Sequence, residues 1–192
     1  MYTTLADTKT YLGIPSATTA DDTLITALIA DAQAMIDSYC LRTFEASADS
    51  TRYFDPTEDV EGRELRLDAD LCAITSITNG DGATIASTQY TTAPRNSTPW
   101  NAIKLLLSSG LSWNYDTDPE SAIVIVGKWA YSTTAPADVA GACKRLAAYL
   151  YRQKDNAGDL DRAVIAGNAT ILPAQIPSDI MVRLAHYKRR TV

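Results

Sequence analysis

The sequence is poor in the residues that build metal sites and nucleophilic active sites. Its 192 residues include a single histidine, His186, and three cysteines at distant positions, Cys40, Cys72 and Cys143. A structural zinc site needs about four Cys or His ligands in closely spaced pairs, and an odd, scattered set of cysteines does not indicate a disulfide framework. We therefore expect no metal, no cofactor and no disulfide, and interpret the cysteines as small buried hydrophobic residues.

Long apolar runs are also missing from the sequence. No stretch approaches the roughly 20 consecutive apolar residues of a membrane-spanning helix. The first residues, 1–7, show no basic region followed by an apolar run, which a signal peptide would need. We expect a protein with no membrane partner that stays in the compartment where it is made.

Positive charge is scarce, since 17 basic residues face 23 acidic ones and the formal net charge is -6. An acidic protein repels the phosphates of DNA and does not grip them. The exception is a basic C-terminal end, Arg183, Lys188, Arg189 and Arg190. This end leaves open a nucleic-acid binding module as an alternative, which predicts an affinity for DNA that salt weakens.

Catalytic motifs are absent as well. Gly80-Asp81-Gly82 lacks the downstream glycine and Lys-Ser/Thr pair of a phosphate-binding loop, and no G-x-S-x-G sequence occurs. The acidic stretch 55–61 lacks the spacing and central glycine of an EF-hand loop, so we interpret it as a solvated loop. The sequence predicts that the protein is not an enzyme.

Helical periodicity is clearest in two long stretches, Asp21 to Arg42 and Pro136 to Lys154, where apolar residues recur at three- and four-residue intervals. Thr19 and Asp22 have the spacing of a capping box at the start of the first stretch. We expect two shorter helices, over 5–12 and from Pro177 onward. The stretch 160–176 between the later helices is predicted to be an extended or loop-like connector.

Between the long helices, from about residue 50 to 131, the period changes to two, as in half-buried strands. Asn79-Gly80-Asp81-Gly82 separates two apolar segments and predicts a β-hairpin turn. The sequence therefore predicts an α+β fold: a helical bundle of two long and two shorter helices with an inserted small antiparallel β-sheet or barrel. We divide it into helices (1–49), the β segment (50–131), the second long helix (132–158) and a connector with a basic C-terminal helix (159–192).

The order of these features resembles the phage head–tail connector family of gp6-like adaptors. The resemblance rests on the opening segments 5–14, 21–29 and 32–40, on the later helix 136–151, and on a strand ending in Gly127-Lys128-Trp129-Ala130-Tyr131 before that helix. It implies a structural protein of the virion neck, made in the host cytoplasm, that forms a homo-oligomeric ring, usually twelve-fold, under the portal. It also implies that the ring binds the portal protein and the next connector or tail-completion protein, and that DNA passes through the lumen unbound.

The family has no catalytic residues, and its C-terminal segment often docks onto the portal. The resemblance implies that the two long helices build the ring and that the basic C-terminal helix is the anchor. We expect the docking residues to be Ile180, Met181, Arg183, Leu184, Tyr187, Lys188, Arg189 and Arg190. Truncation from Ile176 is expected to abolish portal binding while leaving the fold intact. Another neck or tail-terminator ring protein is the alternative within the same class.

Overall fold

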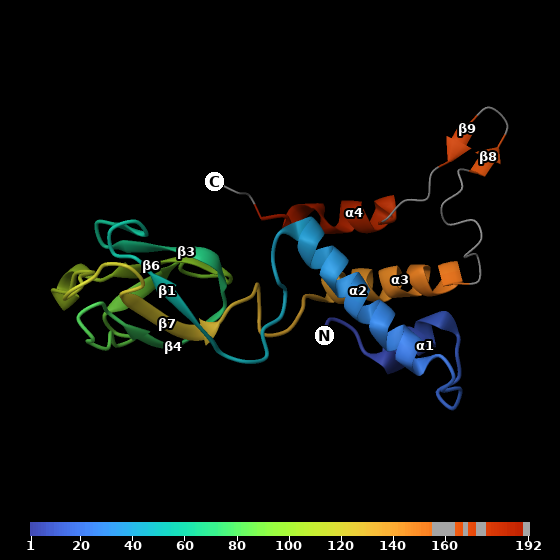
Figure 1. Cartoon of the computed structure of the whole chain (residues 1–192), viewed down its shortest axis with the longest axis horizontal. Helices are drawn as coiled ribbons and strands as arrows, with labels where there is room; N and C mark the ends of the chain where they lie inside the picture. Colours follow the sequence, from blue (N-terminus) through green and yellow to red (C-terminus); the bar gives the residue numbers. More distant parts are fainter. Residues whose placement is uncertain (155–163, 167–168, 172–175, 190–192) are drawn as a thin grey trace. The chain divides into compact units, whose positions relative to one another are not determined.

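The computed structural model describes residues 1–154, 164–166, 169–171 and 176–189, and the chain divides into two compact units (Figure 1). We call Met1–Leu41 together with Ala135–Val192 the helical unit, and Arg42–Thr134 the β unit. The described residues form four α-helices and antiparallel sheets. The predicted α+β class is confirmed.

The helical unit contains α1 (Leu5–Leu12), α2 (Asp22–Cys40), α3 (Ala137–Gln153) and α4 (Ser178–Leu184), which continues into the 3₁₀ turn η3 (Ala185–Tyr187). Each lies where periodicity predicted a helix: α1 has the predicted bounds, the ends of α2 and α3 differ by one or two residues, and α4 begins one residue later than predicted. Helix α3 packs against α1, α2 and α4 and is therefore the centre of this unit. Its apolar side is buried, and it consists of Val139, Ala142, Cys143, Leu146, Ala147 and Ala148.

The capping box predicted from Thr19 and Asp22 is wrong. The residue that caps α2 is Asp21, and it makes no side-chain hydrogen bond to the start of the helix. The Asp21 carboxylate instead accepts hydrogen bonds from the Tyr151 hydroxyl and from Lys154 Nζ, at the end of α3. The Asp22 carboxylate pairs with Lys9 of α1. Both acids are used for contacts between helices, which a local spacing rule does not see.

The β unit holds seven strands in two antiparallel sheets. The three-stranded sheet has the order β1-β7-β4, and the four-stranded sheet has the order β2-β3-β6-β5. The bounds are β1 Ser50–Phe54, β2 Val60–Glu61, β3 Glu64–Leu71, β4 Ala73–Thr78, β5 Tyr90–Ala93, β6 Trp100–Leu105 and β7 Ile123–Lys128. All seven lie within the stretch 50–131 that was predicted to be β, and β2 lies in the part of it that was interpreted as a solvated loop.

The core of the β unit is made of the inward-facing residues of both sheets. Strands β3 and β7 alternate buried and more exposed positions, as expected for strands with one side in a core. The fully buried members include Leu65, Leu71, Ile103, Ile123 and Ile125. Burial of such a side chain contributes about 1.5–3 kcal/mol, so this cluster contributes strongly to the stability of the β unit.

The stretch 160–176 differs from the predicted connector in its described part. Strands β8 (Val164–Ala166) and β9 (Ala169–Ile171) pair antiparallel, with Val164 opposite Ile171 (Figure 1). Segments of three residues are too short for a period-two pattern to be recognised, which is why this part was interpreted as a connector. The remainder of this stretch, apart from Ile176, lies outside the described residues.

Candidate assembly interface

The C-terminal helix α4, where docking was predicted, is anchored in the helical unit by its apolar side. Ile180 is 1% exposed and Leu184 is fully buried. These two predicted docking residues are therefore used for packing inside the chain, where α4 contacts α3. Ile180 and Leu184 are four residues apart, which indicates a buried helical face. This spacing does not tell whether the face is covered by the same chain or by another one.

Polar contacts fix the same helix at both ends. Arg145 Nη1 of α3 lies 2.8 Å from an oxygen of Asp179, and the backbone N–H of Arg189 donates to the carbonyl of Cys40 at 2.9 Å. The Tyr39 hydroxyl donates to the Met181 carbonyl at 3.4 Å. The expectation that truncation from Ile176 leaves the fold intact is therefore not supported, because α4 completes the core of the helical unit.

A basic surface remains on this helix after its buried side chains are set aside. Arg183 and Lys188 are exposed, and Met181, Tyr187 and Arg189 are partly exposed. Lys188 Nζ lies 4.0 Å from the centre of the Tyr39 ring, a cation–π arrangement. Arg190, the last predicted docking residue, lies outside the described residues.

Tyr39 is a residue of this surface that the sequence did not reveal. Its helical spacing in α2 does not distinguish core packing from a surface contact, and its partners Met181 and Lys188 are more than 140 positions away in the chain. No local pattern carries that information. His186, the single histidine, is exposed and its ring stacks on Tyr187 at a centroid distance of 4.0 Å, as expected for a surface residue near a helix end.

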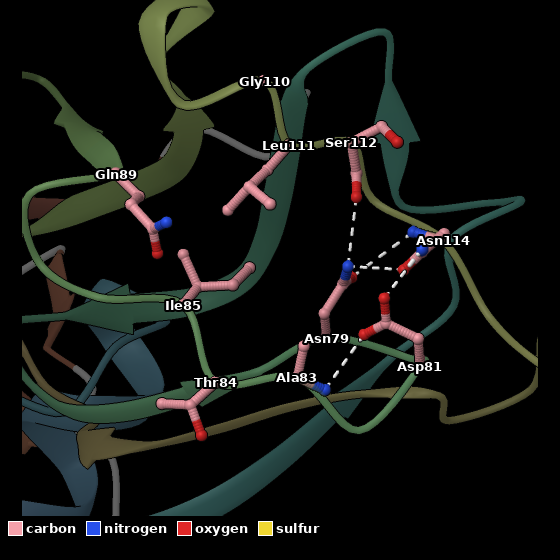
Figure 2. A pocket seen from close by; sticks show the side chains of 10 residues that line it. All are labelled: Asn79, Asp81, Ala83, Thr84, Ile85, Gln89, Gly110, Leu111, Ser112 and Asn114. Carbon is pink, nitrogen blue, oxygen red and sulfur yellow. Dashed lines mark hydrogen bonds between the residues drawn. The ribbon is translucent and has the colours of Figure 1, made fainter.

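A second candidate site is a pocket of about 220 Å³ in the β unit (Figure 2). It lies at the predicted hairpin turn, where the backbone N–H of Asn79 donates to Ala83 at 2.8 Å and Thr78 pairs with Thr84. The turn prediction is confirmed, but the second arm of the hairpin is a single bridge, not a full strand. Asn79 is 3% exposed.

The polar groups in this pocket satisfy one another. The Asn79 amide donates to the Ser112 carbonyl at 3.0 Å and to the Asn114 side chain, while its oxygen accepts from the Asn114 N–H at 3.3 Å (Figure 2). Hydrogen bonds from the Ala83 N–H and from the Asn114 amide lower the pKa of Asp81. We interpret this group as a structural latch that fastens the turn to the segment 112–115.

The acidic stretch after β1 behaves as a solvated loop that is braced by its own carboxylates. Asp59 accepts a hydrogen bond from the Asp55 N–H at 2.8 Å, and Asp55 accepts one from the Ser121 N–H. Among the described residues, no group of three His, Cys, Asp or Glu side chains is arranged to hold a metal ion. In the same part of the chain, no helix combines the length and apolar character needed to cross a membrane.

Residues 2–75 match the sequence model of the phage gp6-like head-tail connector protein family. The match covers α1, α2 and the first strands of the β unit, and it confirms the resemblance drawn from residues 5–40. Comparison with curated proteins gives no match.

Solved structures with a similar fold come from gene transfer agent (GTA) particles. A chain from the neck of an empty GTA particle, computed with C6 symmetry, has a TM-score of 0.62 at 16% identity and covers 98% of this chain and 90% of its own. A chain from the neck of the native GTA particle, computed with C12 symmetry, has a TM-score of 0.58 at 15% identity, with 98% and 89% covered. A chain from the native GTA virion has the same TM-score and identity, with 98% and 90% covered. The similarity therefore includes both units of the fold.

Proposed function

We propose that this chain is a structural head–tail connector subunit in the neck of a tailed bacteriophage or a related particle. The observation that carries the proposal is the likeness to neck proteins over 98% of the chain, together with the family match at residues 2–75. In this role copies of the chain form a ring under the portal, and the ring joins the capsid to the tail.

The division of the chain into two units supports separate roles for them. The helical unit, with the bundle of helices around α3, serves as the ring-building scaffold. The β unit, with its two antiparallel sheets, faces neighbouring subunits or the next tier. The acidic composition of the chain suits a lumen through which DNA passes without being held.

The portal protein is the partner that we assign to the basic surface of α4, centred on Arg183, Lys188 and Arg189. Exposed cations of this kind attract an acidic partner surface and increase the rate of encounter more than the final affinity. Tyr187 and Met181 add partly exposed apolar area beside them. Ile180 and Leu184 are left out of the assignment because they are buried.

The experiment that tests the function is reconstitution with a purified portal ring, followed by negative-stain microscopy. We expect the chain to add a further ring to the tail-facing end of the portal. The double variant Arg183→Glu/Lys188→Glu is expected to weaken this binding about tenfold or more, with Arg152→Glu on the exposed side of α3 as the matched control. A chain that binds duplex DNA but no portal would instead support the nucleic-acid alternative.

A further inference from the structure

The turn that the latch holds contains the single Asn-Gly pair of the sequence, Asn79-Gly80. In such a pair the backbone nitrogen of the glycine can attack the side-chain amide of the asparagine, because glycine has no Cβ to shield the nitrogen and its backbone is permissive. The Gly80 nitrogen gives up its proton and bonds to Cγ of Asn79, the Cγ–Nδ2 bond breaks, and the amide nitrogen leaves with that proton as ammonia. Water then opens the succinimide ring and leaves aspartate or isoaspartate at position 79.

The closed latch fixes the amide that would have to react. The Asn79 amide nitrogen donates to the carbonyl of Ser112 at 3.0 Å and to the side chain of Asn114, and its oxygen accepts from the Asn114 N–H at 3.3 Å (Figure 2). Departure of the amide nitrogen as ammonia breaks both of its hydrogen bonds. The reaction therefore requires the latch to open first.

The backbone around the attacking nitrogen is fixed as well. The carbonyl of Asn79 accepts the Gly82 N–H at 2.9 Å, which holds the peptide plane that contains the Gly80 nitrogen. Gly80 itself pairs with Tyr115 in a parallel β-bridge. Its surroundings are so close that an added Cβ would lie 2.3 Å from the backbone oxygen of Asn114. Ring closure needs rotation of this backbone, and the closed turn leaves no room for it.

We propose that Asn79 is a deamidation site that the closed latch protects, and that opening of the turn exposes it to conversion. The latch lies at the surface, since Ser112 and Asn114 are exposed, and such regions open locally at a lower free energy than that of global unfolding. The adjoining pocket of about 220 Å³ has room for the water that the second step consumes. The inference goes beyond the connector role and does not depend on it.

Conversion prevents the latch from closing again. A carboxylate at position 79 donates no hydrogen bond, so the Ser112 carbonyl and the Asn114 side chain lose their donor. The new charge also lies close to the Asp81 carboxylate, because both side chains contact the side-chain amide of Asn114, and like charges repel. Isoaspartate in addition lengthens the main chain, which shifts the pairing of Asn79 with Ala83. The turn is therefore a one-way switch.

The test is peptide mapping by mass spectrometry of the full-length chain after incubation at mildly alkaline pH, with and without guanidinium chloride. Asn96, which precedes Ser97 in an exposed loop, is the reference within the same sample. In denaturant Asn79 should convert faster than Asn96, because its neighbour is the unshielded Gly80. In the folded chain the order should reverse, because Asn79 reacts only from the open turn.

Two variants show whether the latch itself gives the protection. Asn114→Ala removes the side chain that accepts from Asn79 and donates to Asp81, so conversion of Asn79 in the folded chain should rise about five- to thirtyfold. Ser112→Ala is the matched control, since it keeps the backbone carbonyl that accepts from Asn79, and it should leave the rate unchanged. Asn79→Asp, which carries one of the products, should show faster hydrogen exchange in the turn than the unmodified chain.

Each outcome supports or overturns the inference. A reversal of the order between folded and denatured chain, with acceleration in Asn114→Ala but not in Ser112→Ala, supports it. Equal conversion of Asn79 with and without denaturant overturns it, and so does an Asn79 that stays intact in denaturant. A folded Asn114→Ala chain that converts at the unmodified rate shows that the latch is not the protection. If Asn114→Ala does not fold, the comparison of folded and denatured unmodified chain still decides.

Discussion

In the helical unit, Nζ of Lys9 lies 2.7 Å from a carboxylate oxygen of Asp22, although Lys9 is only 4% exposed. The same ammonium group donates to the carbonyl oxygens of Ser16 at 3.1 Å and Thr18 at 2.6 Å. All three of its protons therefore have acceptors, which is what makes burial of a lysine tolerable. This one side chain holds the loop between α1 and α2 against both helices.

Replacement of this lysine by an apolar residue of similar length is expected to destabilise the helical unit. Lys9→Met leaves the Asp22 carboxylate and two carbonyls without their donor, at a cost of about 2 kcal/mol. Urea unfolding followed by circular dichroism measures the loss, with Arg152→Met on the exposed side of α3 as the control. Equal stability of the two variants would contradict this role for Lys9.

A comparable loss of stability is expected when Asn79, in the latch of the β unit, is replaced. Asn79→Ala removes both donors and the acceptor that fasten the turn to Ser112 and Asn114, and we expect a cost of about 2 kcal/mol. Asn114→Ala should cost less, because Asn114 is more exposed. Thermal unfolding checks the order of the two variants, and the reverse order would show that the latch depends mainly on Asn114.

Two glycines in the same turn offer a matched pair of substitutions. A Cβ at Gly80 would lie 2.3 Å from the backbone oxygen of Asn114, whereas a Cβ at Gly82 meets nothing within 4 Å. Gly82 has a φ of +78°, so alanine there costs only the strain of the left-handed conformation, about 1 kcal/mol. We expect Gly80→Ala to lower the midpoint of thermal unfolding clearly more than Gly82→Ala, because backbone must move to admit it.

The contributions of two aspartates, Asp37 and Asp21, to the stability of the protein are expected to depend on pH in opposite directions. Burial raises the pKa of Asp37 above its ordinary value of 3.8, although a hydrogen bond from the Tyr2 hydroxyl at 2.6 Å opposes the shift. The folded state then holds this proton more tightly than the unfolded state. The stability that Asp37 contributes is complete below pH 3.8 and is lost as the pH rises through the raised folded value.

Asp37→Asn, which is neutral at every pH, should therefore gain stability relative to the unmodified protein as the pH rises. Asp21 is the comparison, because hydrogen bonds from Lys154 and Tyr151 lower its pKa. Its contribution is present above pH 3.8 and is lost as the pH falls through the lowered value. Asp21→Asn should lose stability relative to the unmodified protein over the same rise. Urea titrations across this range measure both slopes, and slopes of the same sign would contradict the assignment.

Helix α4 is predicted to be part of the folding unit and not a detachable anchor. Leu184 is fully buried, so Leu184→Ala should cost about 3 kcal/mol. Val182→Ala should be nearly neutral, since Val182 is 76% exposed. Removal of residues 176–192 should lower stability at least as much as Leu184→Ala. A truncated chain with undiminished stability, measured by urea unfolding, would show that α4 only rests on the surface.

Most secondary structure could be predicted because its causes are local. Helix α1 has the predicted bounds, with Thr4 accepting a hydrogen bond from the Asp7 N–H at its start and Gly13 at φ +75° at its end. The turn at Asn79 was likewise recognisable from four consecutive residues. The absence of catalytic motifs in the sequence was also readable without coordinates, because such chemistry requires residue types that this sequence barely contains.

The candidate interface could be predicted only in part. The sequence correctly marked α4 as a helix with one apolar side and a basic end, but a hydrophobic period does not say which surface covers it. Coordinates were needed to show that Ile180 and Leu184 pack inside the chain while Arg183 and Lys188 stay exposed. Tyr39 belongs to this surface through its contacts with Met181 and Lys188, which cannot be predicted from the spacing of residues in the sequence.

By itself, the sequence determined the helices, most strands and the character of an acidic chain without catalytic motifs, since propensity and periodicity act over a few residues. Only the tertiary structure decided how β1, β7 and β4 pair, why Lys9 can be buried, and that Asp21 and Asp22 join helices and do not cap one. The physical reason is that burial, pairing and hydrogen-bond satisfaction depend on residues far apart in the chain. They exist only once distant segments have been brought together.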